Sequence, residues 1–384
     1  MTDASVLDDI GKMASLDPQG MLGIVETSPD FIKWCLNEFE LENGRNIEKS
    51  IQKLIPKKLA GIFISGMGGS AISGDIIRDW IADAIQVPVI VNREYRLPAC
   101  INPSWLGFFL SYSGNTEETL SAYLDAKRRG IKCICVTSGG SLDEAAVKAG
   151  DLRLRVPGGL QPRAALLYLF TALAIAVADC NLLDKKAMMA DLQESYQVLG
   201  SLSKTLGHAV ALKDNLAKQH AAAVHGTAIL VYGFDFYQSA ARRFKGQLNE
   251  NGKNPAYYDV FPELNHNETV GWEVEPRIAR TFSCFFIRDP AQESPALKVR
   301  IEFTKQLVAA KANSAIEIAP VGKSRLARML SIIYMADFIS VYLAFLNNAD
   351  PTPVKYIQGL KDELRKKANT QADISAGIEK IGKK

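Results

Sequence analysis

Between residues 56 and 180, short runs of consecutive apolar residues alternate with longer segments of helical periodicity. The short runs predict strands over 61–64, 87–91, 106–110 and 131–136. Helices are predicted over 71–84, over 116–129 and from about Pro162 to Cys180. Short apolar strands that alternate with helices are typical of a parallel sheet covered on both faces. Residues 56–180 are therefore predicted to form one α/β domain.

A second series with the same order of elements covers residues 223–347. Its strands are predicted at 228–232, 256–260, 282–287 and 315–318, and its helices at 238–248, 295–309 and 324–346. The two series share almost no sequence identity. The pattern therefore predicts two α/β units of similar architecture.

The remaining segments read as helical. Residues 1–55 are interpreted as a helical N-terminal arm, 181–222 as a helical connector and 348–384 as a helical C-terminal tail. Asp350-Pro-Thr-Pro353 ends the preceding helix, because proline cannot continue one. The apolar stretch 164–178 is shorter than the ~20 residues of a membrane span, so a buried helix is expected there.

Composition narrows the function classes. The chain has 384 residues, 47% hydrophobic and 23% charged, which is ordinary for a globular protein. Its net charge of +3 argues against binding nucleic acid by bulk charge. The N-terminus shows no secretory signal, and the six cysteines form no CxxC pair. Cys133 and Cys135 share one face of a strand and are read as small buried thiols rather than metal ligands. We expect a cytoplasmic protein with reduced thiols and no membrane partner.

Two loops in the first α/β domain carry the clearest chemical signal. Ser65-Gly-Met-Gly-Gly-Ser70 and Ser111-Tyr-Ser-Gly-Asn-Thr116 each follow a predicted strand and open a helix. Ligands bind at this edge of an open α/β sheet. Glycines permit close approach of the backbone, and helix N-termini present free N–H groups. Together with the hydroxyl groups, these features favour a phosphate monoester.

Other nucleotide-binding loops do not fit. No Walker pattern occurs, and Gly66-Met-Gly-Gly-Ser-Ala71 lacks the last glycine of a dinucleotide loop. Either loop alone also fits an ordinary strand–helix turn with an N-cap. The hydroxyl bias shared by both loops shifts the interpretation toward a sugar phosphate.

General acid–base candidates lie in the second series. Glu250 ends a predicted helix, where negative charge is disfavoured, although a solvated helix end is the simpler explanation. His266 stands in a polar loop, flanked by Asn and Glu. His220 and His225 fit a polar helix end and require no function. The scatter of the four histidines predicts no metal site.

Five strings in the sequence together resemble the bifunctional phosphoglucose/phosphomannose isomerases. They are Ser65-Gly-Met-Gly-Gly-Ser-Ala-Ile-Ser-Gly-Asp75, Ser111-Tyr-Ser-Gly-Asn-Thr-Glu-Glu-Thr119, Gln161-Pro-Arg163, Asn249-Glu250 and Glu263-Leu-Asn-His-Asn-Glu268. The resemblance extends from about residue 40 to 367. It implies two sugar-isomerase (SIS) domains, each a doubly wound, flavodoxin-like parallel sheet. It also implies a homodimeric aldose–ketose isomerase of carbohydrate metabolism that needs neither metal nor redox cofactor.

The resemblance also implies roles for single residues. The sugar phosphate would be held by Gly69, Ser70, Ser111, Ser113 and Thr116. Arg163 would stabilise an anionic intermediate, and Glu250 would move the proton between C1 and C2. His266, from the other subunit of the dimer, would contact substrate and assist ring opening. Lys361 would lie near the ring oxygen.

One departure from the family concerns the sugar epimer. Some members have a threonine seven residues before the C-terminal lysine, where this chain has Val354, with Thr352 nearby. Activity on mannose 6-phosphate is thus less firmly implied than activity on glucose 6-phosphate. Three alternatives stay open: an isomerase of glucose 6-phosphate only, a non-catalytic phosphosugar sensor, and an amino-sugar phosphate isomerase.

Overall fold

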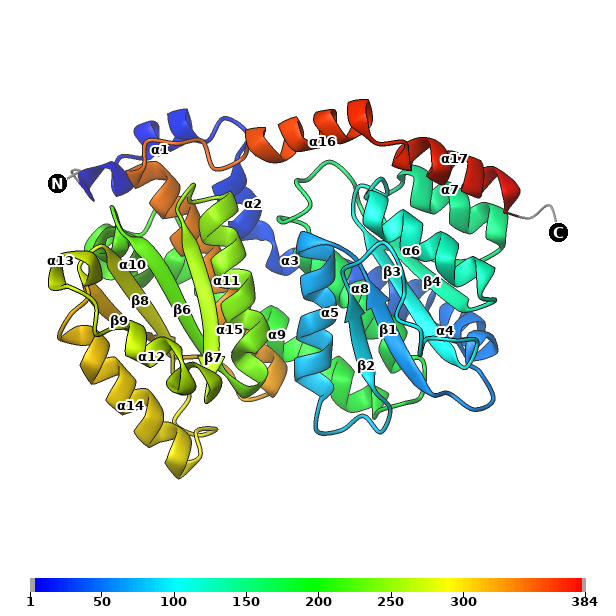
Figure 1. Cartoon of the computed structure of the whole chain (residues 1–384), viewed down its shortest axis with the longest axis horizontal. Coiled ribbons are helices and arrows are strands. Elements are labelled where there is room, and N and C mark those ends of the chain that lie inside the picture. Colours follow the sequence, from blue (N-terminus) through cyan, green and yellow to red (C-terminus); the bar gives the residue numbers. More distant parts are fainter. Residues whose placement is uncertain (1–3, 382–384) are drawn as a thin grey trace. The chain divides into compact units, whose positions relative to one another are not determined.

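The computed structural model describes residues 4–381, and the chain forms two compact units (Figure 1). The first sheet unit comprises Asp30–Leu192 together with the described residues from Val354 onward. The second sheet unit comprises the described residues up to Pro29 together with Gln193–Pro353. Each unit therefore draws on two separate parts of the sequence.

The first sheet unit contains five strands and the helices around them. The strands are β1 (Gly61–Ser65), β2 (Val89–Asn92), β3 (Trp105–Ser111), β4 (Lys132–Thr137) and β5 (Leu152–Arg155). The helices are α3 (Pro29–Leu36), the π-helical η2 (Asn37–Glu42), α4 (Gly44–Leu54), α5 (Gly68–Ile81), α6 (Glu117–Arg128), α7 (Gly140–Ala149), α8 (Leu166–Ala178), α16 (Lys355–Lys367) and α17 (Thr370–Lys380). Helix α9 (Lys185–Leu206) runs from this unit into the other.

The first sheet is parallel, with the strand order β2-β1-β3-β4-β5. This is the doubly wound, flavodoxin-like order. The chain winds outward from β1 in one direction and from β3 in the other. The switch point, where such folds bind ligands, therefore lies between the carboxyl ends of β1 and β3.

Helices cover both faces of the first sheet. On one face, Phe63, Phe109, Cys133 and Cys135 join a buried cluster with residues of α6, α7 and α17. On the other face, α5 packs closely enough that a Cβ at Gly74 would lie 2.9 Å from the Ile64 side chain. Helix α8 packs against α5, and all of its residues except Tyr168 are buried. The expectations of buried thiols and of a buried apolar helix are thus confirmed.

The second sheet unit contains four strands. They are β6 (Ala228–Phe234), β7 (Ala256–Phe261), β8 (Phe282–Ile287) and β9 (Ser314–Ile318). The helices are η1 (Ala4–Leu7), α1 (Ile10–Leu16), α2 (Met21–Thr27), η3 (Leu212–Asp214), α10 (Leu216–Val224), η4 (Asp235–Tyr237), α11 (Gln238–Glu250), η5 (Glu263–His266), α12 (Glu268–Gly271), α13 (Pro276–Ala279), α14 (Pro295–Ala309) and α15 (Arg325–Leu346).

The second sheet is also parallel, with the order β7-β6-β8-β9, so its switch point lies between β6 and β8. Helices α11 and α15 pack against each other, and the ring centroids of Phe244 of α11 and Phe285 of β8 lie 4.8 Å apart. Helix α14 contacts β7, β8 and β9. The two predicted α/β units are thus confirmed, each with a doubly wound sheet.

Helix α15 is the one helix among residues 4–381 that is long and apolar enough to cross a membrane. Its most apolar window has a mean hydropathy of 1.9, and 94% of that window is buried inside the protein. The central helix of a folded core has this same composition, so length and hydropathy alone are weak evidence for a membrane span.

Candidate active site

Two glycines shape the loop that follows β1. A Cβ at Gly66 would lie 2.9 Å from the Leu110 carbonyl oxygen of β3. A Cβ at Gly69 would lie 2.9 Å from the Pro162 carbonyl oxygen and 3.2 Å from Arg163 Cα. Only glycine leaves room for these approaches. The first turn of α5 is therefore in direct contact with the segment that carries Arg163.

The loop that follows β3 brings its hydroxyl groups together. The Ser111 and Thr116 hydroxyl oxygens are 3.0 Å apart. Gly114 adopts a left-handed conformation, with φ of 69°, and closes the turn with a hydrogen bond from its N–H to the Ser111 carbonyl. Ser113 is exposed, and its hydroxyl accepts a hydrogen bond of 3.3 Å from the Asn115 N–H. Thr116 is the N-cap of α6.

Tyr112 ties this loop to the segment that precedes Arg163. Its hydroxyl donates to the Pro157 carbonyl at 2.8 Å and accepts from the Leu160 N–H at 3.1 Å. Its own carbonyl accepts hydrogen bonds from the N–H and the hydroxyl of Ser138, which follows β4. Three loops at the carboxyl edge of the sheet are thereby held in fixed register.

The predicted phosphate-binding residues therefore gather at the switch point of the first sheet. Gly69 and Ser70 lie in the first turn of α5, whose N-terminus presents backbone N–H groups and a positive dipole end. Arg163 is only 3% exposed and adjoins Gly69. Backbone donors, hydroxyl groups and one guanidinium suit a phosphorylated, otherwise polar ligand.

Glu250, in the second sheet unit, is the last residue of α11 and is half-buried. The sequence did not single out Lys253, whose ammonium group donates to the Glu250 carbonyl at 2.5 Å. The same group donates to the carbonyls of Pro351 at 3.0 Å and Pro353 at 2.7 Å. Its signal in the sequence is a lysine that directly follows the Asn-Gly end of a helix, where a cation offsets the helix dipole.

His266 is exposed and lies at the end of η5, also in the second sheet unit. The turn around it is anchored on both sides. Leu264 is buried, and the Asn265 amide donates to the hydroxyl of Thr304 at 2.8 Å. After it, the Asn267 side chain caps α12. The His266 side chain is thus exposed on a turn that buried and hydrogen-bonded neighbours anchor.

Glu268, two residues further on, is a group that the sequence analysis left unassigned. Its carboxylate accepts a 2.5 Å hydrogen bond from the Tyr232 hydroxyl, which itself accepts from the Trp272 indole at 3.3 Å. Burial raises the pKa of Glu268 to about 7; neighbouring Asp259 adds to this rise, and the Tyr232 hydrogen bond opposes it. A carboxyl group that titrates near neutrality therefore supports the turn that carries His266.

Lys361 is exposed on α16, within the first sheet unit. Val354 is the N-cap of that helix. Thr352, in the second sheet unit, is 3% exposed, and its N–H donates to the Asp350 side chain at 2.8 Å.

The structure corrects one minor assignment. His220 lies within α10 and is half-buried against the Phe285 ring at 6.1 Å, rather than at a polar helix end. Its burial lowers its pKa. Among residues 4–381, no three His, Cys, Asp or Glu side chains are grouped so that they could hold a metal ion.

Comparisons with known proteins show which families and solved structures this chain is similar to. Residues 53–178 match the SIS domain family, and residues 213–364 match the bacterial phospho-glucose isomerase C-terminal SIS domain. In solved structures, the chain is similar to the C-terminal domain of glucosamine-fructose-6-phosphate aminotransferase from Francisella tularensis. That likeness has a TM-score of 0.65 at 15% identity and covers 87% of this chain and 98% of that one. At this identity the likeness shows the fold alone.

Curated relatives are closer in sequence. The bifunctional phosphoglucose/phosphomannose isomerase of Caldicellulosiruptor bescii is 41% identical, over 84% of this chain and 94% of that protein. The protein of the same name from Aquifex aeolicus is 36% identical, over 86% of this chain and 96% of its own length. The chain matches two SIS domains, and it aligns with these relatives over almost their full length. Both findings confirm the resemblance seen in the sequence. The chain belongs to the bifunctional phosphoglucose/phosphomannose isomerases, a family of sugar phosphate isomerases.

Proposed function

We propose that this isomerase interconverts glucose 6-phosphate, and also mannose 6-phosphate, with fructose 6-phosphate in the cytoplasm. The observation that carries the proposal is the edge of the first sheet. There the Ser111 and Thr116 hydroxyls lie 3.0 Å apart, and Gly69 adjoins Arg163, in a chain of this family.

The phosphate group anchors the substrate. Its oxygens accept hydrogen bonds from the hydroxyls of Ser70, Ser111, Ser113 and Thr116 and from the N–H groups around Gly69 at the start of α5. Binding energy gained at this end orients the carbon atoms that react at the other end. The phosphate itself takes no part in the chemistry.

Isomerisation then moves one proton between neighbouring carbons. The Glu250 carboxylate removes the proton from C2 of the open-chain aldose, and the electron pair forms the C1–C2 double bond of a cis-enediolate. The negative charge develops on the C1 oxygen, and a proton passes from the O2 hydroxyl to O1. Protonation at C1 by the same carboxyl group then gives the ketose, with a hydroxyl on C1 and the carbonyl at C2. Arg163 stabilises the negative charge on the enediolate oxygens. General base catalysis of this kind contributes ~10²–10⁴-fold.

Ring opening precedes proton transfer. It requires a base that removes the proton of the O1 hydroxyl and an acid that protonates the ring oxygen, and His266 and Lys361 have suitable side chains. We propose that the enzyme is a homodimer and that His266 acts on the substrate held by the other subunit. Its exposed position on an anchored turn supports this role.

The test is a coupled assay of fructose 6-phosphate formation from each aldose, with Glu250→Gln beside the parent protein. Because amide nitrogen and oxygen cannot take the proton, turnover should fall by at least ~10²-fold. Fructose 6-phosphate should still bind in calorimetry. Exposed Glu273→Gln, the matched control, should keep full activity.

The other outcomes separate the alternatives. Turnover of glucose 6-phosphate alone would indicate an isomerase without activity on the C2 epimer. Binding without turnover in the parent protein would favour a phosphosugar sensor. Near-normal turnover in Glu250→Gln would refute the role of this residue.

A further inference from the structure

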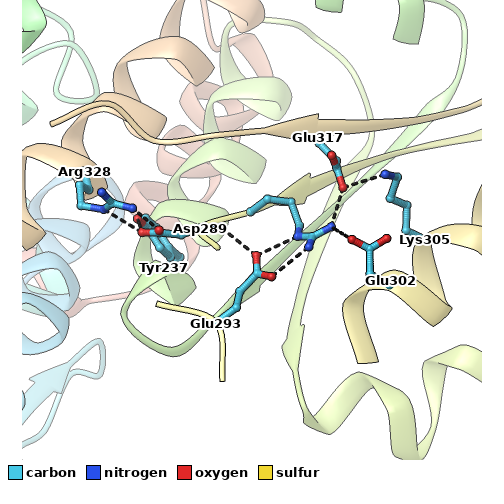
Figure 2. A network of polar contacts seen from close by, with 8 residues as sticks. Tyr237, Asp289, Glu293, Glu302, Lys305, Glu317 and Arg328 are labelled. Atoms are coloured by element: carbon cyan, nitrogen blue, oxygen red, sulfur yellow. Dashed lines mark hydrogen bonds and ion pairs between the residues drawn. The ribbon is translucent and has the colours of Figure 1, made fainter. Parts of the chain in front are cut away.

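Both sheet units are doubly wound, but the loops at their two switch points carry different kinds of side chain. In the first unit, the loops after β1 and β3 carry glycines and hydroxyl groups. In the second unit, the corresponding loops after β6 and β8 carry aromatic and charged side chains. Figure 2 shows the polar network that Tyr237, Asp289 and Glu293 of these loops form with side chains of α14, β9 and α15.

Asp289 is the centre of this second edge. It is the second residue after β8 and is 0% exposed. The Tyr237 hydroxyl, which follows β6, donates to its carboxylate at 2.5 Å. From the first turn of α15, Arg328 donates through Nε at 2.8 Å and forms a second, shorter bond to the other oxygen. The carboxylate thus bridges the switch point between β6 and β8.

The position of Arg328 in the second unit corresponds to that of Arg163 in the first unit. There, Arg163 stands just before α8, the helix that packs against α5. Here, Arg328 stands at the start of α15, the helix that packs against α11. Each unit therefore has one arginine near the start of such a helix and beside its own switch point. In the second unit, Arg328 is paired with Asp289.

The surrounding charges disfavour any further anion. Beside Asp289, Arg288 makes ion pairs with Glu293 at 2.8 Å, Glu302 at 2.8 Å and Glu317 at 2.6 Å. Lys305 also pairs with Glu317. Arg288, Lys305 and Arg328 are therefore each paired with carboxylates of this network. A phosphate dianion would have to compete with these carboxylates for the same cations.

The Asp289 carboxylate is held in its charged form. Burial alone would raise its pKa, but hydrogen bonds from Arg328 and Tyr237 outweigh burial and lower the pKa. The fully buried Asp289 carboxylate accepts hydrogen bonds from a guanidinium and a hydroxyl, which are donors of the kind that bind a phosphate group.

We propose that Asp289 takes the place of a phosphate group at the switch point of the second sheet, so that this unit contains a closed anion site. The chain then binds one sugar phosphate, at the first sheet, and its second sheet serves to position side chains. This stoichiometry rests on the proposed function, whereas the closed anion site does not.

The test removes the internal anion. Asp289→Ala leaves a space beside Arg328 and Tyr237, whereas Asp289→Asn removes the charge and keeps the volume. Both are made in a Ser111→Ala/Thr116→Ala background, which weakens anion binding at the first sheet. Phosphate stabilises folded proteins in general relative to chloride, so Asp289→Asn gives the background difference between the two salts at equal ionic strength. In Asp289→Ala, this difference in unfolding temperature should be at least about 3 °C larger than in Asp289→Asn.

Two further measurements keep the proposal testable. Arg328→Met added to Asp289→Ala should abolish the part of the phosphate response that exceeds the Asp289→Asn background. If Asp289→Ala folds poorly, its refolding yield should rise in phosphate and not in chloride. A difference between phosphate and chloride that is no larger in Asp289→Ala than in Asp289→Asn, in unfolding temperature or in refolding yield, would overturn the closed anion site.

Calorimetry on the parent protein separates the two ideas. One fructose 6-phosphate bound per chain supports the proposal, and two per chain would overturn it. No binding at all would refute the proposed function, and the closed anion site would then be judged by the phosphate response of Asp289→Ala.

Discussion

The ammonium group of Lys253 donates a 2.5 Å hydrogen bond to the main-chain oxygen of Glu250. The same ammonium group reaches the carbonyls of Pro351 and Pro353, and Lys253 adopts a left-handed conformation, with φ of 53°, that directs the chain back toward them. A cation is therefore fixed at the C-terminal end of α11, where unpaired carbonyls and the helix dipole are negative. This contact holds the helix end that carries the proposed base.

Replacing Lys253 should impair catalysis more than folding. Lys253→Met removes the donor shared by the three carbonyls, so the last turn of α11 should fray and Glu250 should lose its fixed position. We expect kcat to fall about tenfold with little change in KM. The free energy of unfolding should fall by only ~1 kcal/mol, because hydrogen bonds of an exposed side chain contribute little. Coupled assays and thermal unfolding measure the two effects.

The controls for this prediction separate position from charge. Lys253→Arg keeps a multidentate donor and should recover much of the activity. Lys245→Met, the same substitution within α11 itself, should behave like the parent protein. Parent-like kcat in Lys253→Met would show that the contact does not position Glu250.

A side chain at Gly69 should disturb the site without unfolding the sheet. The added methyl group of Gly69→Ala would meet the Pro162 carbonyl at 2.9 Å and push away the segment that carries Arg163. We expect kcat/KM to fall by ~10²-fold, because small displacements of positioning groups are costly. Gly158→Ala, whose methyl group meets nothing closer than 3.8 Å, is the control. Equal activity in the two variants would contradict the prediction.

The Glu268 carboxyl should make stability depend on pH. Its pKa is about 7 in the folded protein against 4.5 without these surroundings, so the unfolded chain releases the proton first. Stability should therefore fall as pH rises from 4.5 to about 7, and level off above. The groups that face it are Tyr232, Asp259 and Cys284.

Glu268→Gln isolates this contribution. The difference in unfolding temperature between the parent protein and Glu268→Gln should change across that pH interval. A constant difference would show that the Glu268 carboxyl titrates at an ordinary pKa.

Mixed dimers should reveal whether His266 acts across subunits. His266→Ala and Glu250→Gln are each expected to be inactive. If His266 serves the substrate of the other subunit, reassociated mixtures contain a site with both native residues and should recover up to about a quarter of the activity, since half of the dimers are mixed and each has one intact site. No recovery, with subunit exchange verified by labelled chains, would place both residues in one chain's site.

The sequence predicted the buried elements of this fold well. Central strands such as β3 and β8 are continuous apolar runs because both of their faces are covered. Strand β5 and helix α7 escaped prediction. In β5, arginines alternate with leucines because it is an edge strand with one exposed face, so it lacks the continuous apolar run.

The sequence predicted those parts of the site whose residues are close together in the chain, and it missed those that depend on distant partners. The hydroxyl loops were recognisable because their residues are contiguous and because strand ends of a parallel sheet share one edge. Lys253 and Asp289 were not recognised. Their significance lies in partners 98 and 39 residues away, Pro351 and Arg328, and no local pattern encodes such pairings.

Helix α17 has a consequence for how the first sheet unit is synthesised. Ile374 and Ile378 of α17 are buried in the cluster that also contains Tyr123 of α6. On a ribosome, the surface of α6 is complete long before these isoleucines have been synthesised. The nascent first sheet unit therefore carries an uncovered apolar patch until α17 has been synthesised, and a chain terminated before α17 would expose that patch to aggregation or to chaperones.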